Sequence, residues 1–194
     1  MKSPFYFVIK SRDGKRYDNE RNGIIISTSK EDHLTTMREA VVISTPIGYE
    51  GPIEVGDMVL VHHNTFRIYY DMKGREKSSW NYFRDDLFFI DDPYAYKKPD
   101  GTWKGIGRYV FVKPMENDLS GITTIDAEKP LTGTIRYGND ETLAAGLNEG
   151  DVVVFEPHSE YEFRIDGEKL YRMYTKNLLI KLNEQDNGVK ETNN

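Results

Sequence analysis

The chain has 194 residues, of which 38% are hydrophobic and 30% are charged, and its formal net charge is −6. The absence of cysteine excludes disulfide bonds, thiolate metal sites and cysteine catalysis, and it is typical of a reducing compartment. The acidic net charge argues against nucleic acid as the main partner. No apolar run is long enough for a membrane span or a secretory signal, and we therefore expect a cytoplasmic protein.

The first predicted strand is residues 5–10, "FYFVIK", and a long polar segment follows it over residues 11–40. Inside that segment stands one apolar group, "GIIIS", at residues 23–27. Three consecutive isoleucines among polar neighbours have two interpretations: a short buried strand, or a segment presented to a partner that shelters it. A further strand is predicted at residues 40–44, and Ser29 before "KEDHLTTMR" predicts a short helix inside the polar segment.

The residues that follow have the signals of a β-rich unit. Gly56-Asp57 precedes the apolar run "MVLV", a hairpin pattern with a loose turn follows in "FRIYYDMKGREKSSWNYF", and "DDLFFID" predicts another strand. Residues 93–107 are rich in Pro, Gly and Lys and predict a linker, although its tyrosines and Trp103 favour packing on a neighbouring surface.

The last third of the chain has the clearest strand signals. The run "DVVVF" begins at Asp151, and "EYEFRI" (160–165) alternates apolar and polar residues before Asp166-Gly167, the pair that a type I′ hairpin turn prefers. An alternative makes residues 168–182 one amphipathic helix, but the turn and the alternation favour a hairpin. Upstream of these strands, Asn139 predicts the cap of a short helix.

These signals predict an internal repeat. Gly56-Asp57 and "MVLV" are matched later by Gly150-Asp151 and "VVVF", "DDLFFID" is similar to "KNLLIKL", and the other strand patterns follow in a similar order. We therefore expect an all-β protein of two tandem, partly open β-barrels with long loops, over residues 1–92 and 108–183. The polar tail, residues 184–194, is expected to be disordered.

The second unit carries an ordered set of motifs. Gly133-Thr134-Ile135 comes first, and "NEGDVVVFEPHSEYEFRIDGEKLYRMYTKNLLIKL" follows at residues 148–182. This set resembles the GroES-type co-chaperonins (the chaperonin-10 family), which have a G-x-V strand, a V-G-D turn before an apolar strand, an I-D-G-E hairpin and a closing apolar strand. The first unit resembles the family more loosely, through Val55-Gly56-Asp57 and "DDLFFID".

The resemblance implies a role for the three isoleucines. In this family a mobile loop after the first strand carries a glycine followed by three aliphatic residues, and it binds a GroEL-type chaperonin ring. The resemblance thus implies a co-chaperonin that forms a homo-oligomeric ring, caps a chaperonin and needs no cofactor. The implied chaperonin-binding residues are Gly23, Ile24, Ile25 and Ile26 in the first unit, and Gly121, Ile122 and Ile125 in the second.

The sequence also departs from the family pattern. The second segment, "GITTI" at residues 121–125, has threonines in place of two aliphatic residues, which weakens the expected contact. Two units per chain cannot fill a seven-membered ring with whole chains, so the ring uses one barrel per chain or an even number of barrels. An alternative function is a structural or assembly protein, such as a virion component, that reuses the barrel. A cellular and a viral or phage origin both stay open.

No motif indicates an enzyme. His62-His63, His33 and His158 lack the ligand spacing of a metal site. Asp85-Asp86 and Asp91-Asp92 stand beside strand ends and a proline, where aspartates act as turn residues. The chain has no Walker-type or Rossmann-type glycine motif. We therefore expect no catalytic residue and no metal.

One segment has the composition of a nucleic-acid surface. "SSWNYF", residues 78–83, lies close in the chain to Lys73, Arg75 and Lys77 and is a candidate stacking platform for single-stranded nucleic acid. The acidic net charge favours the other interpretation, in which this is an aromatic strand packed on its own barrel or on a neighbouring subunit.

Overall fold

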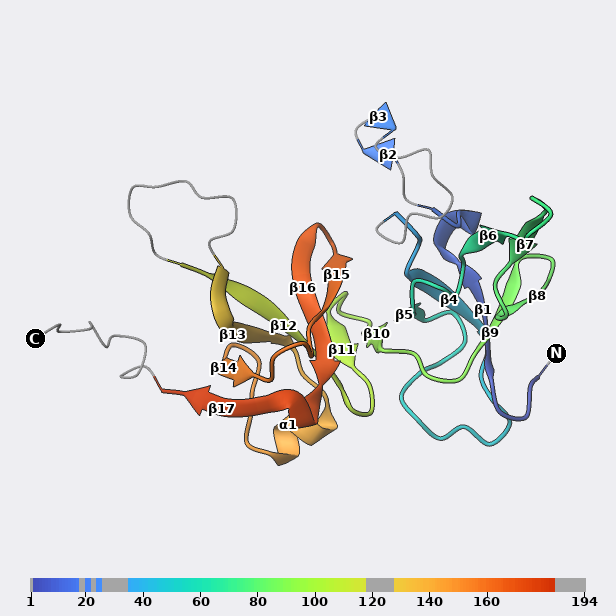
Figure 1. The fold of residues 1–194 in the computed structure, drawn as a ribbon. Coiled ribbons are helices and arrows are strands. Elements are labelled where there is room, and N and C mark those ends of the chain that lie inside the picture. The colour runs from blue at the N-terminus through green and yellow to red at the C-terminus, as the bar shows by residue number, and fades with distance from the viewer. Residues whose placement is uncertain (1, 18–19, 22–23, 26–34, 118–127, 184–194) are drawn as a thin grey trace, which may run out of the picture. The chain divides into compact units, whose positions relative to one another are not determined.

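The computed structural model describes residues 2–17, 20–21, 24–25, 35–117 and 128–183 (Figure 1). The chain divides into two compact units, Met1–Trp103 and Lys104–Asn194. Strands account for about half of the described residues and helical elements for only a few, which agrees with the predicted all-β class. No helix among these residues has the length and apolar character needed to cross a membrane. The helical elements are α1 (Asp140–Ala144) and two 3-10 turns, η1 (Arg12–Gly14) and η2 (Thr175–Asn177).

The first unit is built on a seven-stranded sheet with the order β11-β10-β5-β4-β1-β9-β8, whose end strand β11 begins at Trp103, the last residue of the unit. The strands of this sheet are β1 (Phe7–Ser11), β4 (Glu39–Ser44), β5 (Met58–Leu60), β8 (Tyr82–Arg84), β9 (Leu87–Ile90), β10 (Ala95–Lys97) and β11 (Trp103–Gly105). Two separate two-stranded sheets accompany it: β2 (Glu20–Arg21) with β3 (Ile24–Ile25), and β6 (Ile68–Tyr70) with β7 (Glu76–Ser78).

The second unit is built on a six-stranded sheet with the order β15-β16-β12-β13-β14-β17. Its strands are β12 (Tyr109–Glu116), β13 (Glu128–Tyr137), β14 (Val152–Phe155), β15 (Tyr161–Ile165), β16 (Glu168–Tyr174) and β17 (Leu178–Leu182). The aromatic rings of Phe111 and Phe163 meet edge to face in its core, with 5.6 Å between centroids. A second buried cluster contains Val110, Val112, Ile135, Val153, Phe155 and Met173.

The two sheets share one connectivity. The order β10-β5-β4-β1-β9-β8 in the first unit corresponds strand for strand to β17-β14-β13-β12-β16-β15 in the second, and every neighbouring pair in both series is antiparallel. Among the residues that the structure describes, the first unit has one addition between corresponding strands, the β6–β7 hairpin, which lies between β5 and β8.

This connectivity corrects two parts of the predicted repeat. First, the hairpin pattern of residues 66–83 predicts the counterpart of residues 161–174, but β6–β7 is a separate sheet and β8–β9 corresponds to β15–β16. Second, the sequence comparison set residues 85–91 against 176–182, which would make β9 the counterpart of β17. In the structure β9 pairs with β1 as β16 pairs with β12, so β9 corresponds to β16, and β10 corresponds to β17. Short apolar strands look alike in sequence, and their partners in the sheet distinguish them.

The two Gly-Asp turns of the repeat have the same geometry. Asp57 Oδ2 accepts a hydrogen bond from the backbone N–H of Glu54, and Asp151 Oδ2 accepts one from that of Asn148, both over 2.8 Å. In each case the aspartate bonds to the backbone three residues earlier, and this closes the turn that leads into β5 or β14. In the second unit Lys181 Nζ also lies 2.6 Å from Asp151 Oδ2.

Two local predictions in the second unit are confirmed. β15 and β16 form a hairpin with Arg164 opposite Lys169, and Asp166 and Gly167 have φ values of 50° and 84°, so the helix alternative for residues 168–182 is wrong. Asn139 caps α1: its side chain accepts a hydrogen bond from the backbone N–H of Thr142 over 2.7 Å. The predicted helix after Ser29 falls mostly outside the described residues.

The predicted linker is a packed hairpin. Within residues 93–107, β10 pairs with β5, and the Lys98 N–H donates to the Thr102 carbonyl across the turn toward β11. Tyr94 is buried and its N–H donates to the Leu60 carbonyl of β5, while Trp103 is only 1% exposed with Lys97 Nζ over its ring, so this stretch is packed and not a solvated linker. The boundary between the two compact units therefore lies inside the predicted linker, after Trp103.

Candidate functional site

The predicted partner-binding segment of the first unit lies in the connection between β1 and β4. Ile24 and Ile25 form β3, in which Ile24 pairs with Arg21 and Ile25 with Glu20 of β2. This pair is a sheet of its own, separate from the seven-stranded sheet (Figure 1). Of the other two predicted contact residues, Gly23 and Ile26, the structure gives no description.

The ends of the predicted loop, residues 11–40, are parts of strands. Ser11 closes β1, and Glu39 and Ala40 open β4, because their backbone groups pair across the β1–β4 ladder. The connection itself therefore runs over residues 12–38.

The predicted contact residues of the second unit occupy the corresponding connection, between β12 and β13. Gly121, Ile122 and Ile125 all fall in residues 118–127, outside the described part of the chain. The two candidate segments therefore lie in corresponding connections. β1 and β4 have the same places in the first sheet as β12 and β13 have in the second.

The parts of the first connection next to β1 and β4 contact each other and form a stem. Its outgoing arm is residues 12–17, and its returning arm is residues 35–38. At its base Arg12 Nη1 lies 2.7 Å from Glu39 Oε2, and further out Tyr17 forms an isolated antiparallel bridge with Thr36. Thr35, Thr36 and Met37 of the returning arm are buried. The stem is therefore part of the folded unit.

The second connection has a stem held by different chemistry. Asn117 Nδ2 donates to the Glu128 carbonyl over 3.3 Å, which joins the two arms where the connection begins and ends. The carboxylate of Glu128 accepts hydrogen bonds from Lys169 Nζ over 2.8 Å and from the Tyr171 hydroxyl over 2.6 Å. Both donors belong to β16, so this carboxylate ties the returning arm to the sheet.

The protonation equilibria reflect this contact. Partial burial raises the pKa of Glu128, but the hydrogen bonds from Lys169 and Tyr171 outweigh it, so the pKa of this carboxyl lies below its usual value. The hydrogen bond to Glu128 raises the pKa of Lys169. Burial, together with the same carboxylate, raises the pKa of the Tyr171 hydroxyl. At neutral pH the contact is therefore an ion pair with a neutral tyrosine beside it.

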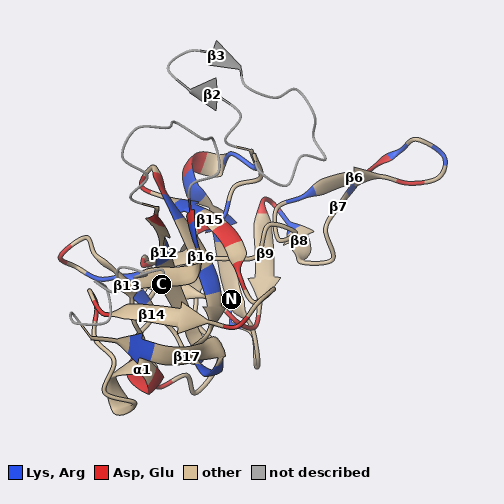
Figure 2. Ribbon diagram, turned by 60° about the vertical axis from the view of Figure 1, so that its left-hand side comes forward, with Lys and Arg blue, Asp and Glu red and all other residues tan. Residues whose placement is uncertain are grey.

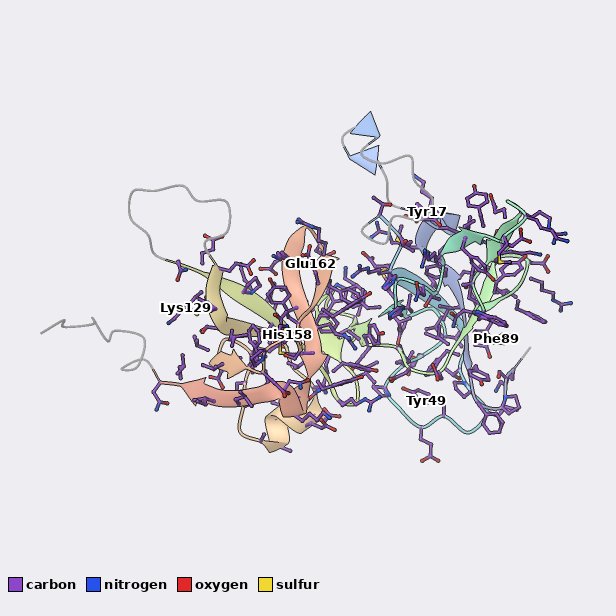
Figure 3. All side chains as sticks on the ribbon, viewed as in Figure 1. Tyr17, Tyr49, Phe89, Lys129, His158 and Glu162 are labelled. Atoms are coloured by element: carbon purple, nitrogen blue, oxygen red, sulfur yellow. The ribbon has the colours of Figure 1, made fainter. Side chains whose placement is uncertain are left out.

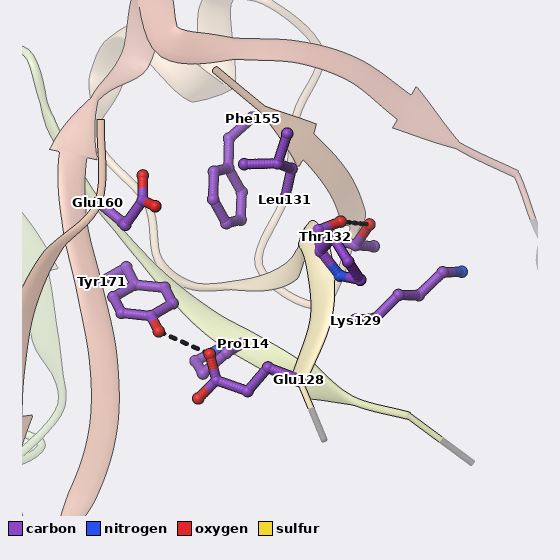
Figure 4. A pocket seen from close by; sticks show the side chains of 9 residues that line it. Pro114, Glu128, Lys129, Leu131, Thr132, Phe155, Glu160 and Tyr171 are labelled. Carbon is purple, nitrogen blue, oxygen red and sulfur yellow. Dashed lines mark hydrogen bonds between the residues drawn. The ribbon is translucent and has the colours of Figure 1, made fainter. Parts of the chain in front are cut away.

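A cavity of about 270 Å³ adjoins this stem (Figure 4). Its walls are mostly apolar, with the Glu128–Tyr171 hydrogen bond on one side and the Glu160 carboxylate on another. The residues that line it are Pro114, Glu128, Lys129, Pro130, Leu131, Thr132, Phe155, Glu160 and Tyr171.

Two of the other sequence candidates, Asp85-Asp86 and His62-His63, have ordinary structural positions, and His33 lies outside the described residues. Asp85 and Asp86, with φ values of 50° and 58°, form the β8–β9 turn, as their turn composition predicted. The rings of His62 and His63 stack with 4.1 Å between centroids. Among the residues that the structure describes, no group of three His, Cys, Asp or Glu is placed to hold a metal ion.

The "SSWNYF" segment combines packed and exposed aromatic residues. Tyr82 and Phe83 contact Phe88 and Phe89 of β9, with ring centroids 5.5 and 5.1 Å apart. They are also 39% and 42% exposed, so these contacts agree only in part with the packed-strand interpretation. Trp80 is 98% exposed. The charges around it are balanced, and Figure 2 shows both signs on the β6–β7 hairpin. Residues 71–86 contain the cations Lys73, Arg75, Lys77 and Arg84, and the acidic residues Asp71, Glu76, Asp85 and Asp86.

Sequence reasoning placed the candidate segments in the chain but missed the residues that hold their stems. Arg16, Tyr17 and Glu128 were not singled out, because their partners are distant in sequence. Their position close to the strands that flank the two connections is the signal that could have found them.

Comparison with known proteins gives one informative result. The chain is 37% identical, over 78 residues, to the "Co-chaperonin GroES" of Symbiobacterium thermophilum. The match covers 34% of this chain and 80% of that protein. No protein-family model matches the chain.

Proposed function

Because the chain belongs to the GroES co-chaperonin family, we propose that it is itself a co-chaperonin, which assembles into an oligomer and caps a chaperonin ring. The observation that carries the proposal is the 37% identity to a co-chaperonin over 80% of that protein's length. The position of Ile24 and Ile25 supports it, since they stand in the β1–β4 connection and outside the seven-stranded sheet.

In this proposal the residues Gly23 to Ile26 bind the partner by burying the isoleucine side chains. Moving one such side chain from water into an apolar groove yields about 1.5–3 kcal/mol. Ordering the segment on binding costs about 1–2 kcal/mol per backbone residue, so one segment binds weakly. Residues Gly121, Ile122 and Ile125 would make a second, weaker contact of the same kind.

Oligomerisation makes weak segments effective. A ring that presents several copies to a matching ring gains avidity, because each later contact forms at high effective concentration. The chaperonin can release all copies together when its grooves move apart. In this proposal the chain caps the cavity in the cytoplasm, carries out no catalysis of its own and uses no cofactor.

The edge strand β17 supports an oligomer. It ends the order of the six-stranded sheet, and its Leu179 and Ile180 side chains are each 57% exposed. An apolar edge strand of this kind is a surface on which another chain adds a strand. In the proposed assembly, barrels from neighbouring chains pair along such edges.

The test is a variant with Ile24, Ile25 and Ile26 all changed to Ser. We expect an intact fold and oligomer by circular dichroism and light scattering, and no detectable binding to a GroEL-type chaperonin in a pull-down with nucleotide. The matched control is Ile47→Ser, because Ile47 is a 61% exposed isoleucine outside both connections. It should bind as the unchanged chain does.

Three results would count against the proposal. Unfolding of the triple variant would mean that the isoleucines belong to the core. A chain that stays monomeric at micromolar concentration could not form a cap. A stable oligomer that never binds chaperonin would favour the assembly-protein alternative.

A further inference from the structure

Arg16, in the outgoing arm of the first stem, contacts β7, β8, β9 and the β8–β9 turn at once. Its Nη1 donates to Ser78 Oγ of β7 over 2.9 Å, and its Nη2 lies 3.5 Å from Asp86 Oδ1 in the β8–β9 turn. The guanidinium also lies over the rings of Tyr82 and Phe88, 5.2 and 5.1 Å from their centroids. The side chain is 18% exposed. A planar cation that stacks and donates in fixed directions suits such a position, and lysine would not reproduce it.

The next residue, Tyr17, makes a second connection to the same region. Its hydroxyl accepts a hydrogen bond from the backbone N–H of Ile68, the first residue of β6, over 2.7 Å. Tyr17 is labelled in Figure 3. The returning arm is joined to the same two residues, because Met37 N–H donates to the Arg16 carbonyl over 2.9 Å and Thr36 bridges Tyr17.

The β6–β7 hairpin that receives these contacts has no counterpart in the second unit. There β14 leads to β15 through residues 156–160 alone. The hairpin projects from the rest of its unit in Figure 2, but its base is fixed: Phe66, just before β6, is fully buried against Phe88 with 4.7 Å between ring centroids. The base of the hairpin is therefore rigid enough to hold another segment.

We propose that Arg16 and Tyr17 are positioning residues, which anchor the stem of the isoleucine-bearing connection to the β6–β7 hairpin and to the β8–β9 turn. This inference rests on the proposed function, since it assigns the anchor to the presentation of Ile24 and Ile25. The β6–β7 hairpin would hold the first connection at a fixed position where it leaves the unit. An anchored stem has less freedom to lose on binding, which strengthens the contact of the segment beyond it.

The test uses the full chain and two variants. Tyr17→Phe removes the acceptor for the Ile68 N–H, and Arg16→Met keeps the length of the side chain while removing its charge and donors. Arg84→Met is the matched control, because Arg84 is a 65% exposed arginine of neighbouring β8 whose guanidinium lies over Phe83.

The first measurement is hydrogen exchange of the Ile68 and Met37 amides, without partner. We expect exchange at Ile68 to rise about fivefold to tenfold in Tyr17→Phe, the effect of losing one hydrogen bond. Exchange at Met37 should rise in Arg16→Met, and neither should change in Arg84→Met. Unchanged exchange rates in both variants would show that Arg16 and Tyr17 do not anchor the stem.

The second measurement is affinity for a GroEL-type chaperonin. We expect both variants to bind about threefold to tenfold more weakly than the unchanged chain, with the same oligomeric state and melting temperature within a few degrees. Arg16→Lys should recover little of the loss. Faster exchange with unchanged affinity would overturn the positioning role. If the unchanged chain does not bind a chaperonin, the proposed function is wrong, and so is the role of Arg16 and Tyr17 in presenting the isoleucines. The exchange data would still show whether these two residues anchor the stem.

Discussion

The backbone N–H groups of Gly56 and Gly150 make the same hydrogen bond in the two units. Each donates over 2.8 Å to a carbonyl of the neighbouring strand, that of Val42 in β4 or of Ile135 in β13. The two glycines have φ values of 96° and 92°. This conformation is readily accessible only to glycine, so the turn that begins β5 and β14 depends on the residue type.

Replacing either glycine should therefore destabilise its unit. We expect Gly56→Ala and Gly150→Ala each to lower the free energy of unfolding by about 1–2 kcal/mol, from backbone strain alone, because an added Cβ meets no atom within 4 Å. Urea unfolding followed by circular dichroism measures the change. Glu54→Ala, an exposed substitution in the first turn, is the control and should stay within about 0.5 kcal/mol. An alanine variant with an unchanged midpoint would contradict the expectation.

The Glu128 ion pair predicts a loss of stability in acid. Because the pKa of Glu128 is lowered by folding, its contribution is present above the unfolded value of about 4.3 and disappears as the pH falls through the folded pKa. Glu128→Gln should cost about 1 kcal/mol at pH 7, a modest figure because the carboxylate is partly exposed.

Thermal melts between pH 7 and pH 3 test this expectation. The difference between the unchanged chain and Glu128→Gln should shrink as the pH falls below about 4. Glu160→Gln is the matched control, because Glu160 lines the same cavity without that ion pair. A difference that stays constant over this pH range would show that the charge of Glu128 contributes nothing.

Asn139 should be among the costliest polar residues to remove. It is fully buried, it caps α1, and its Nδ2 donates over 2.8 Å both to the Tyr109 carbonyl and to Thr175 Oγ1. We expect Asn139→Ala to destabilise the second unit by about 2–3 kcal/mol, since it removes the cap and leaves buried groups without partners. Urea unfolding measures the loss. Asp140→Ala, at the next, solvent-exposed position, should cost less than about 1 kcal/mol.

The two tryptophans offer a direct test of the packed hairpin at residues 93–103. Trp103 is 1% exposed and Trp80 is 98% exposed. The emission of Trp103 in Trp80→Phe should resist acrylamide quenching, whereas that of Trp80 in Trp103→Phe should be quenched strongly. Trp103→Ala should cost about 3–5 kcal/mol and Trp80→Ala less than about 0.5 kcal/mol. Equal quenching of the two tryptophans would mean that residues 93–103 are a solvated linker.

Elements with local signals could be predicted from the sequence. The β15–β16 hairpin is an example, because the alternation of residues 160–165 and the Asp166-Gly167 turn act within a few residues of each other. The cap at Asn139 is another, since its main acceptor contact is only three residues away. The place of the isoleucines between two strands also followed from chain order alone.

What the sequence could not supply were relationships between distant residues. The correspondence of β9 with β16, and the packing of Trp103 in the predicted linker, depend on which strands pair. The stem anchors are of the same kind: Arg16 meets Ser78 and Tyr17 meets Ile68, 62 and 51 residues away. The sequence by itself determined the β class, the turns and the order of the segments, because short-range sterics and hydrogen bonds set them. Only the tertiary structure decided how the connections are held, because that depends on side chains that folding alone brings together.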